Sequence, residues 1–369
     1  MKLSRAVKVV ITHDYLVEYG GAERLVEMLL KIFPGAAVVT LCYDRKVFPK
    51  NWNKYQIKPL FPVLPFSKKY PQFWGILYAL TILNYDLSEY DLIISSDQIF
   101  AKMVRVLPGQ KHICYQHSPS NVLYEYLPKV RKNFWHKLFA FATCLQKDFL
   151  RLVEAYSVEN IDRLLTNSAN SAQRIAKYWG MAAEVVFSGV EIPERILAGE
   201  KEDFFLVVAR IEPAKRIEIA IEACLKQKVA LKVVGDGSAL MDLKKNSGAM
   251  VELLGKVNDV KRDELYQRAK ALIVVAEEDL GLTPIEAMSW GTPVIAYGRG
   301  GVSETVVENV TGVFFCEQNV ESLSEAIVRF QKIKFDPEVC REQARKFSFK
   351  RFEKRWLSIV DEVITEVYG

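Results

Sequence analysis

The sequence predicts an α/β protein built from two doubly wound parallel sheets. Short apolar, β-branched segments alternate with segments of helical periodicity along most of the chain, which is the pattern of repeated strand–helix units. The alternation comes in two successive runs, separated near 187–201 by a stretch interrupted by glycine and proline. The chain has 369 residues, half of them hydrophobic, so it is long enough for two cores.

The first run opens with a short β-branched strand at 7–12, followed by a helix at 22–32 whose apolar residues fall on one face. A later helix at 168–180 ends in glycine. Further buried strands are expected at 37–41, 92–95, 112–115 and 163–167.

The second run repeats this alternation. Strands are expected at 204–209, 231–234, 251–254, 271–275 and 294–296, and helices at 217–225, at 263–270 and from Pro284 onward. These elements predict an N-terminal domain at 1–188 and a C-terminal domain at 189–349.

Composition excludes several classes of protein. The longest clean apolar run, at 73–83, has eleven residues, whereas a bilayer-spanning helix needs ~20. The apolar N-terminal stretch runs into His13 and Asp14 and favours a strand over a secretion signal. The six cysteines form no C-x-x-C pair, so we expect no zinc site or disulfide framework and a cytoplasmic protein.

Charge is distributed unevenly. The first 190 residues contain more lysine and arginine than acids, and the remainder shows the reverse. No acid occurs between Lys46 and Tyr78, where lysines alternate with aromatic residues. This composition suits an anionic membrane surface or a nucleic acid, and a buried helix with a solvated lysine rim explains it equally well. A second basic segment at 129–132 precedes Phe134, Trp135 and Phe139 and allows the same two interpretations.

Four segments follow expected strands, at the edge where open α/β sheets bind ligands. In the first, Gly20 and Gly21 open a helix. Backbone N–H groups without a Cβ nearby suit an anion. A glycine pair at this place is also often just a tight turn.

The second segment places Arg210 and Lys215 on either side of Pro213. An arginine fork and a lysine point charge can converge on one phosphate group. Two solvated surface cations are the simpler explanation when the pair is considered alone.

The third segment runs from Glu277 to Glu286 and passes through a Gly-Leu-Thr loop to Pro284, which is expected in the first helical turn. The N–H groups of Leu282 and Thr283 would face an anion. Glu278 and Glu286 could accept hydrogen bonds from sugar hydroxyl groups, although Glu286 alone could be an ordinary helix-surface acid.

The fourth segment contains His117, which follows the strand at 112–115. A histidine there can act as an acid, a base or a donor near neutral pH. A lone histidine is more often structural, and this applies also to His13, which is expected at the end of the first strand.

In their order and spacing, these segments resemble family 4 of the retaining nucleotide-sugar glycosyltransferases, and most of all its mannosyltransferase-like branch. In the C-terminal half, the motifs that carry the resemblance are Arg210-Ile211-Glu212-Pro213-Ala214-Lys215, Gly235-Asp236-Gly237, Leu254-Gly255-Lys256-Val257, Glu278 with Glu286, Gly291-Thr292-Pro293-Val294-Ile295-Ala296 and Gly300-Gly301-Val302-Ser303-Glu304. The N-terminal half adds Gly20-Gly21, the segment 90–96, the His117 loop and Asn167-Ser168.

The resemblance implies the GT-B fold, in which two Rossmann-like domains face a cleft. The C-terminal domain would bind the nucleotide-sugar donor and the N-terminal domain the acceptor. The last helix, at about 350–369, would pack back on the N-terminal domain.

The resemblance also implies residue roles. Arg210 and Lys215 would hold the diphosphate, Glu278 the transferred sugar and Glu286 the ribose. The remaining residues would contact the donor as follows: Gly281, Leu282 and Thr283 through backbone N–H groups, Gly235 at its loop, Lys256 and Val257 near the base, Gly20 and Gly21 from the phosphate side, and His117 near the reacting carbon.

The family is thought to retain the anomeric configuration by same-face attack, so we name no protein nucleophile. The sequence has no Asp-x-Asp pair of the kind that holds a divalent ion, and we expect neither a metal nor a cofactor. We expect GDP-mannose as the donor and a lipid-linked or polysaccharide glycan as the acceptor. Association with the inner face of the cell membrane is compatible with the basic segments, and no nucleic-acid partner is expected.

Two departures and three alternatives accompany this resemblance. The branch often has an arginine and a Trp-Asp pair where this chain has Asn121, Tyr124 and Glu125, and Arg216 stands where many members have glycine. The alternatives are a UDP-sugar-dependent transferase, a nucleotide-sugar epimerase or phosphorylase of the same fold, and a non-catalytic module that binds membrane or nucleic acid.

Overall fold

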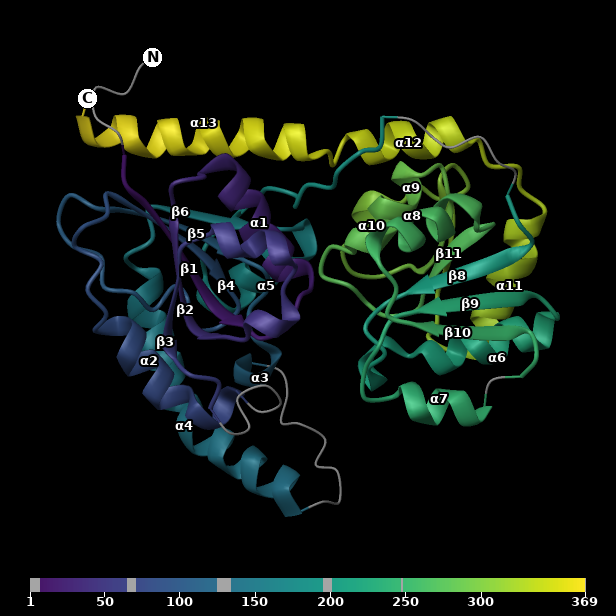
Figure 1. Cartoon of the computed structure of the whole chain (residues 1–369), viewed down its shortest axis with the longest axis horizontal. Helices are drawn as coiled ribbons and strands as arrows, with labels where there is room; N and C mark the ends of the chain where they lie inside the picture. The colour runs from purple at the N-terminus through teal and green to yellow at the C-terminus, as the bar shows by residue number, and fades with distance from the viewer. Residues whose placement is uncertain (1–6, 65–70, 125–133, 195–200, 247, 369) are drawn as a thin grey trace. The chain divides into compact units, whose positions relative to one another are not determined.

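The chain forms two compact units, which the computed structural model describes at residues 7–64, 71–124, 134–194, 201–246 and 248–368 (Figure 1). Unit 1 comprises Met1–Val186 together with Glu353–Gly369, and unit 2 is Phe187–Phe352. Each unit contains a parallel sheet with helices on both faces, which confirms the predicted fold class.

The sheet of unit 1 has seven strands among the described residues, all paired in parallel, in the order β3-β2-β1-β4-β5-β6-β7. The order turns back between β1 and β4, as in doubly wound folds. The strands are β1 (Val9–Leu16), β2 (Ala37–Tyr43), β3 (Ile57–Phe61), β4 (Leu92–Asp97), β5 (Lys111–Gln116), β6 (Arg163–Thr166) and β7 (Glu184–Val185).

Helices cover both faces of this sheet. On one face, α2 and α4 pack together and bury Tyr78, Ile82 and Leu150. On the other, Trp356 of α13 stacks on Tyr115 of β5, with ring centroids 6.1 Å apart. The helices are α1 (Gly21–Ile32), α2 (Gly75–Leu83), α3 (Asn121–Tyr124), α4 (Phe134–Val158), α5 (Ala169–Trp179) and α13 (Phe349–Tyr368).

Unit 2 has a six-stranded parallel sheet in the order β10-β9-β8-β11-β12-β13, counted over its described residues. The order turns back between β8 and β11, so the carboxyl ends of these two neighbours lie at the switch point. The strands are β8 (Phe204–Val208), β9 (Ala230–Val234), β10 (Val251–Gly255), β11 (Ala271–Val274), β12 (Val294–Tyr297) and β13 (Gly312–Phe315).

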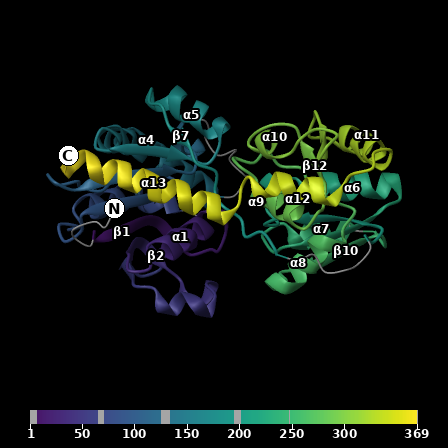
Figure 2. The same ribbon diagram turned by 90° about the horizontal axis from the view of Figure 1, so that it is seen from above.

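Two hydrophobic clusters fill the faces of this sheet. The first joins it to α6 (Ile217–Gln227), α7 (Leu240–Asn246) and α11 (Val320–Gln331). The second joins it to α8 (Asp259–Arg268), α9 (Leu282–Ser289), α10 (Val302–Thr305) and α12 (Pro337–Arg345). Figure 2 shows α12 beside α9, with which it packs.

Among the predicted boundaries that differ from the structure, three bear on the candidate sites. β1 runs to Leu16, so His13 lies inside the strand, where it pairs in register with Ser96 of β4. α8 begins at Asp259 rather than at 263, because the Asn258 side chain accepts from the Lys261 N–H at 2.8 Å and caps it. α9 begins at Leu282, two residues before Pro284.

The basic, aromatic segment that starts at Lys46 is not one helix. It comprises the 3₁₀ turns η1 (Arg45–Val47) and η2 (Lys50–Lys54), strand β3, the turn η3 (Pro71–Trp74) and α2. Lys68 and Lys69 lie outside the described residues, as do 129–132 and the side chains of Phe134, Trp135 and Phe139. Among the helices that were described, none combines the length and hydropathy needed to span a bilayer.

Candidate functional site

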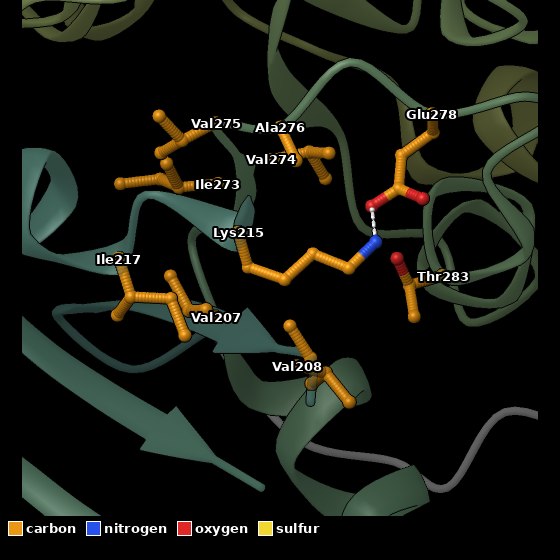
Figure 3. A pocket seen from close by; sticks show the side chains of 11 residues that line it. Val207, Val208, Lys215, Ile217, Ile273, Val274, Val275, Ala276, Glu278 and Thr283 are labelled. Carbon is orange, nitrogen blue, oxygen red and sulfur yellow. Dashed lines mark hydrogen bonds and ion pairs between the residues drawn. The ribbon is translucent and has the colours of Figure 1, made fainter. Parts of the chain in front are cut away.

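A pocket lies at the switch point of unit 2, between the carboxyl ends of β8 and β11. It contains about 290 Å³ of empty space, part of which is open to solvent. Strand residues such as Val207 and Val274 form an apolar wall, and Lys215, Glu278 and Thr283 supply polar groups (Figure 3). Open α/β sheets bind their ligands at this position.

Lys215 and Glu278 form an ion pair in the pocket. Lys215 comes from the 3₁₀ turn η4 (Pro213–Lys215) after β8, and Glu278 comes from the loop after β11. Lys215 Nζ donates to Glu278 Oε1 at 2.6 Å, and each side chain is about one quarter exposed (23% and 24%). The structure therefore brings these two predicted residues together, with the ammonium group fixed and accessible.

A turn of two glycines holds the Glu278 loop in place. Glu278 pairs with Gly300 in an isolated bridge, and the Gly301 N–H donates to the Glu278 carbonyl at 2.7 Å. A Cβ on Gly300 would lie 2.4 Å from that carbonyl oxygen, and one on Gly301 would lie 2.2 Å from the Asp279 carbonyl oxygen. Only glycine permits this approach, so these motif glycines position the carboxylate.

The N-terminus of α9 faces the same region. Gly281 precedes the helix with φ +82°, a left-handed conformation that favours glycine. Leu282 and Thr283 are the first two helical residues, so their N–H groups have no partner within the helix. Pro284 stands third, where its missing N–H costs nothing. The helix start thus offers N–H groups and a positive dipole end to an anion.

Glu286 lies one turn further along α9 and is not part of the pocket lining. Tyr266 Oη of α8 donates to Glu286 Oε2 at 2.8 Å. Burial would lower the pKa of Arg262, but the carboxylates of Glu286 and Asp263 outweigh it and raise that pKa. The partners Tyr266 and Arg262 were not predicted, because their helix reads in the sequence as an ordinary polar surface helix.

The other donor-side residues occupy neighbouring strand ends without lining the pocket. Arg210 is exposed just after β8, and Lys256 is exposed just after β10, beside the half-buried Val257. Gly235 follows β9 with φ +144°, and a Cβ there would lie 1.8 Å from the Ala209 carbonyl oxygen. All these strands are parallel, so the residues share one edge of the sheet.

Arg216 adopts a left-handed conformation, with φ +53°, directly before α6. This explains why glycine suits the position, since a side chain is strained there. Arg216 Nε donates to Glu218 Oε1 at 3.1 Å on the surface.

In unit 1, a chain of polar groups crosses the switch point between β1 and β4. Ser96 Oγ lies 3.0 Å from His117 Nε2 and 3.1 Å from His13 Nδ1. Glu23 Oε1 lies 3.7 Å from His13 Nε2, and Glu23 Oε2 accepts from the Gly20 N–H at 2.8 Å. The predicted residues Gly20 and His117 are therefore the two ends of one network.

The two histidines of this network titrate differently. Burial is the main cause that lowers the pKa of His117 to about 3, and the charge of His13 acts in the same direction. Burial also acts to lower the pKa of His13, but contact with the Glu23 carboxylate outweighs it and raises that pKa. The sequence singled out His13 only as a lone histidine, and Ser96 only as the end of the 90–96 segment. Gly21 is the first residue of α1.

A buried ionic cluster in unit 1 was also missed. Lys102 Nζ lies 2.7 Å from Asp97 Oδ2 and 2.9 Å from Glu154 Oε1, and all three side chains are fully buried. Tyr124 Oη donates to Glu154, and Trp179 Nε1 donates to Tyr124 Oη at 3.1 Å. Tyr124, one of the departures from the branch pattern, therefore contacts this cluster.

Within the parts of the chain that the structure describes, no group of three or more His, Cys, Asp or Glu residues is arranged to hold a metal ion. Metal independence stays a prediction.

Two doubly wound parallel sheets, one of which has a cation, a carboxylate and a helix N-terminus at its switch point, define a GT-B type protein. Residues 190–347 match the family model of glycosyl transferases group 1. Most of unit 2 is therefore similar to glycosyl transferases group 1, and the resemblance seen in the motifs is confirmed.

Curated relatives are similar at 25–28% identity. An uncharacterized glycosyltransferase of Methanocaldococcus jannaschii is 27% identical over 47% of this chain and 50% of its own length. A D-inositol 3-phosphate glycosyltransferase of Kribbella flavida is 28% identical over 48% and 50%. The α-1,3/1,6-mannosyltransferase ALG2 of Dictyostelium discoideum is 25% identical over 78% and 79%. The chain thus spans about half the length of the first two relatives.

Solved structures share the fold over nearly the whole chain. HepE of Anabaena, in complex with UDP, has a TM-score of 0.71 at 16% identity and covers 96% of this chain and 100% of its own. Sucrose-phosphate synthase of Thermosynechococcus elongatus has a TM-score of 0.71 at 18% identity and covers 97% and 100%.

Proposed function

We propose that this protein is a retaining glycosyltransferase that moves a hexose from a nucleotide-sugar donor to a glycan acceptor. The observation that carries the proposal is the Lys215–Glu278 pair beside the N-terminus of α9, in a unit that matches glycosyl transferases group 1. A fixed cation and helix N–H groups suit the diphosphate of such a donor. A neighbouring carboxylate suits the hydroxyl groups of its sugar.

The roles that we propose are those that the family resemblance implies for these residues. Lys215 and Arg210 bind the diphosphate, and Glu278 accepts hydrogen bonds from hydroxyl groups of the transferred sugar. The N–H groups at 281–283 bind the same sugar and the phosphates, and Glu286 holds the ribose. Preorganised charge of this kind stabilises the transition state more than the bound substrate.

The remaining predicted residues have supporting roles in the proposal. Lys256 and Val257 contact the base, Gly235 lets the loop after β9 approach closely, and His117 contacts the sugar near its reacting carbon. Gly20 and Gly21 leave room for the phosphates at the start of α1.

The proposed reaction needs no protein nucleophile. The bond between the anomeric carbon and the diphosphate oxygen breaks through an oxocarbenium-like state, and the electron pair stays on the diphosphate. The acceptor oxygen then bonds to the anomeric carbon from the same face, and its proton passes to the leaving diphosphate. Lys215 and Arg210 stabilise the charge that develops on that diphosphate.

We propose GDP-mannose as the donor, with UDP-glucose as the second candidate. The relative named as a mannosyltransferase supports mannose, and HepE complexes that contain UDP and UDP-glucose support the second candidate. A thermal-shift panel of GDP, UDP, ADP and their sugar conjugates distinguishes the two. A ligand at 100 times its Kd adds ~2.7 kcal/mol of stability. The shift should persist in EDTA if no metal is needed.

Lys215→Ala tests the site itself. Removing one preorganised cation from the leaving group should cost ~3 kcal/mol, a loss of about a hundredfold or more in donor turnover. Lys226→Ala is the matched control, since Lys226 is half exposed on α6 and pairs only weakly with Glu321 at 3.7 Å. Wild-type turnover in Lys215→Ala would refute the diphosphate role.

We further propose that the acceptor is lipid-borne and that unit 1 binds an anionic membrane surface. On α2, Ile76, Leu77 and Leu80 are 38–44% exposed. On the packed neighbour α4, Phe141 and Leu145 are 62% and 69% exposed. Together with the preceding lysines, this apolar face suits an interfacial contact.

Sedimentation with anionic vesicles tests this surface. The double variant Leu77→Glu, Leu80→Glu should remain in the supernatant, because charged residues do not enter the bilayer interface as leucine does. Val260→Glu, at a 79% exposed position of unit 2, is the control and should sediment like the wild type. Equal sedimentation of all three proteins would refute the membrane contact.

A further inference from the structure

We propose that Ser96 and His13, the latter held by Glu23, are positioning residues that keep His117 in the neutral tautomer with its proton on Nδ1. The role of this tautomer in sugar transfer rests on the proposed function. The tautomer itself follows from where each proton of the network can lie.

The first step is the proton on His13. His13 Nδ1 lies 3.0 Å from the Ser96 carbonyl oxygen, which can only accept a hydrogen bond. His13 Nδ1 therefore carries a hydrogen and donates it to Ser96. The register of the sheet enforces this contact, because His13 and Ser96 are direct partners in the β1–β4 pair.

The second step is the hydroxyl proton of Ser96. Because His13 Nδ1 already carries a hydrogen, it cannot accept one from Ser96 Oγ, although the two atoms are only 3.1 Å apart. The other ring nitrogen within reach of Ser96 Oγ is His117 Nε2, at 3.0 Å. A serine hydroxyl has one hydrogen to donate, and of these two ring nitrogens His117 Nε2 is the one that can accept it.

The third step is the state of His117. Its Nε2 accepts from Ser96, so a neutral ring must hold its hydrogen on Nδ1. Burial of the ring, which holds the pKa of His117 near 3, agrees with a neutral ring throughout the physiological range. The charged groups that face the pair are Glu23 and Asp14 around His13, and His13 and Glu23 around His117.

Glu23 completes the arrangement. Its carboxylate lies 3.7 Å from His13 Nε2 and is itself held by the Gly20 N–H at 2.8 Å. A negative charge at this place favours a proton on both nitrogens of His13. In that charged ring Nδ1 of His13 is a donor, on which the orientation of the Ser96 hydroxyl depends.

The consequence for the reaction is specific. The Nε2 lone pair of His117 accepts the hydrogen bond from Ser96, so His117 contributes a fixed N–H donor rather than a general base. In the proposed function this donor binds an oxygen of the transferred sugar. Free imidazole side chains in water favour the opposite tautomer, so the state of His117 is a measurable signature.

Nitrogen-15 NMR of histidine-labelled protein tests the proposal. The chain has four histidines, and the His117→Gln spectrum identifies the signals of that ring. We expect an unprotonated Nε2 and a protonated Nδ1 for His117, unchanged between pH 5 and 8. In Ser96→Ala this pattern should be lost, and Ser96→Thr, which keeps the hydroxyl group, should restore it.

Ser95→Ala is the matched control. Ser95 is the neighbouring buried serine of β4, and its Oγ lies 2.8 Å from His112 Nε2. This variant should move the signals of His112 and leave those of His117 in place. A protonated Nε2 on His117 in the wild type, or an unchanged His117 pattern in Ser96→Ala, would overturn the proposal. The result is independent of turnover, so failure of the proposed function would show separately in Lys215→Ala.

Discussion

Replacing Lys102 by methionine should destabilise unit 1 severely. The ammonium group lies 2.7 Å from Asp97 and 2.9 Å from Glu154, and it also donates to the Ile99 carbonyl oxygen at 3.0 Å. The three charged side chains have no exposed surface. Methionine has a similar volume, so the change removes the charge and the donors while keeping the packing.

The expected cost is about 3–5 kcal/mol, the usual range when one partner of a buried ion pair is removed. Two carboxylates would stay in the core without their cation, and the cost of an uncompensated buried charge exceeds that of the lost contacts. Lys111→Met provides the scale, because the Lys111–Asp162 pair is 20–26% exposed. That control should cost no more than about 1 kcal/mol.

The loss should depend on pH. Burial raises the pKa of Asp97 to about 6, although Lys102 acts to lower it. A carboxyl group whose pKa is raised in the folded state stabilises the fold below its unfolded pKa of ~3.9 and loses that contribution as pH rises through the folded value. Without Lys102 the raised pKa increases further, so Lys102→Met should be less damaging at pH 5 than at pH 8.

Urea unfolding followed by tryptophan fluorescence measures this effect. Trp290 is the single tryptophan in the range of unit 2, so a Trp290→Phe background restricts the signal to unit 1. Adding Asp97→Asn and Glu154→Gln to Lys102→Met removes the uncompensated charges and should restore part of the stability. A loss below 1 kcal/mol in Lys102→Met, or no recovery in the triple variant, would refute the reasoning.

Three further predictions concern single positions. Arg216→Gly should stabilise unit 2 by about 1 kcal/mol in thermal unfolding, because glycine adopts the left-handed backbone conformation of this position without steric strain. An unchanged or lower Tm would contradict this. Gly300→Ala should displace Glu278 and weaken nucleotide-sugar binding, because the added Cβ would clash with the Glu278 carbonyl oxygen. Gly255→Ala is the control, since Gly255 has a similar φ of +68° but open space around it, and this variant should cost only backbone strain. Equal effects of the two variants on binding would argue against the clash. Trp356→Ala should cost unit 1 about 3–5 kcal/mol, which chemical denaturation would show, and a small loss would mean that α13 is dispensable.

The fold was predictable to the extent that its elements bury apolar faces. In unit 2, β8 and β11 are continuous apolar runs, and both were located within one residue of the observed ends. β1 was cut short because His13 and Asp14 look like a loop in the sequence. Their side chains contact β4 and the loop after it, at 98–101, and His13 also contacts Glu23 of α1. The partners in β4 and its loop are far away in the sequence and leave no local signal.

Some residues of the candidate sites were predictable from the sequence, and others were not. Lys215, Glu278 and Thr283 were predicted to act together, and the structure places them in one pocket. Motif order was sufficient here because each residue follows a strand of one parallel sheet. Ser96 and Glu23 could not be predicted as partners of a histidine, because the 13–96 register depends on the whole sheet.

The return of α13 to unit 1 has a consequence for the order in which the protein folds during synthesis. Unit 1 begins the chain, but the helix that covers Tyr115 is made only after all of unit 2. At ~5–20 residues per second this delay is roughly 10–30 s, during which the part of the first sheet around Tyr115 lacks this helix. Unit 2 is a continuous segment and can complete its own core first. The nascent chain therefore depends most on chaperones while unit 2 is being translated, and a fragment that ends at Val186 should aggregate unless residues 353–369 are supplied.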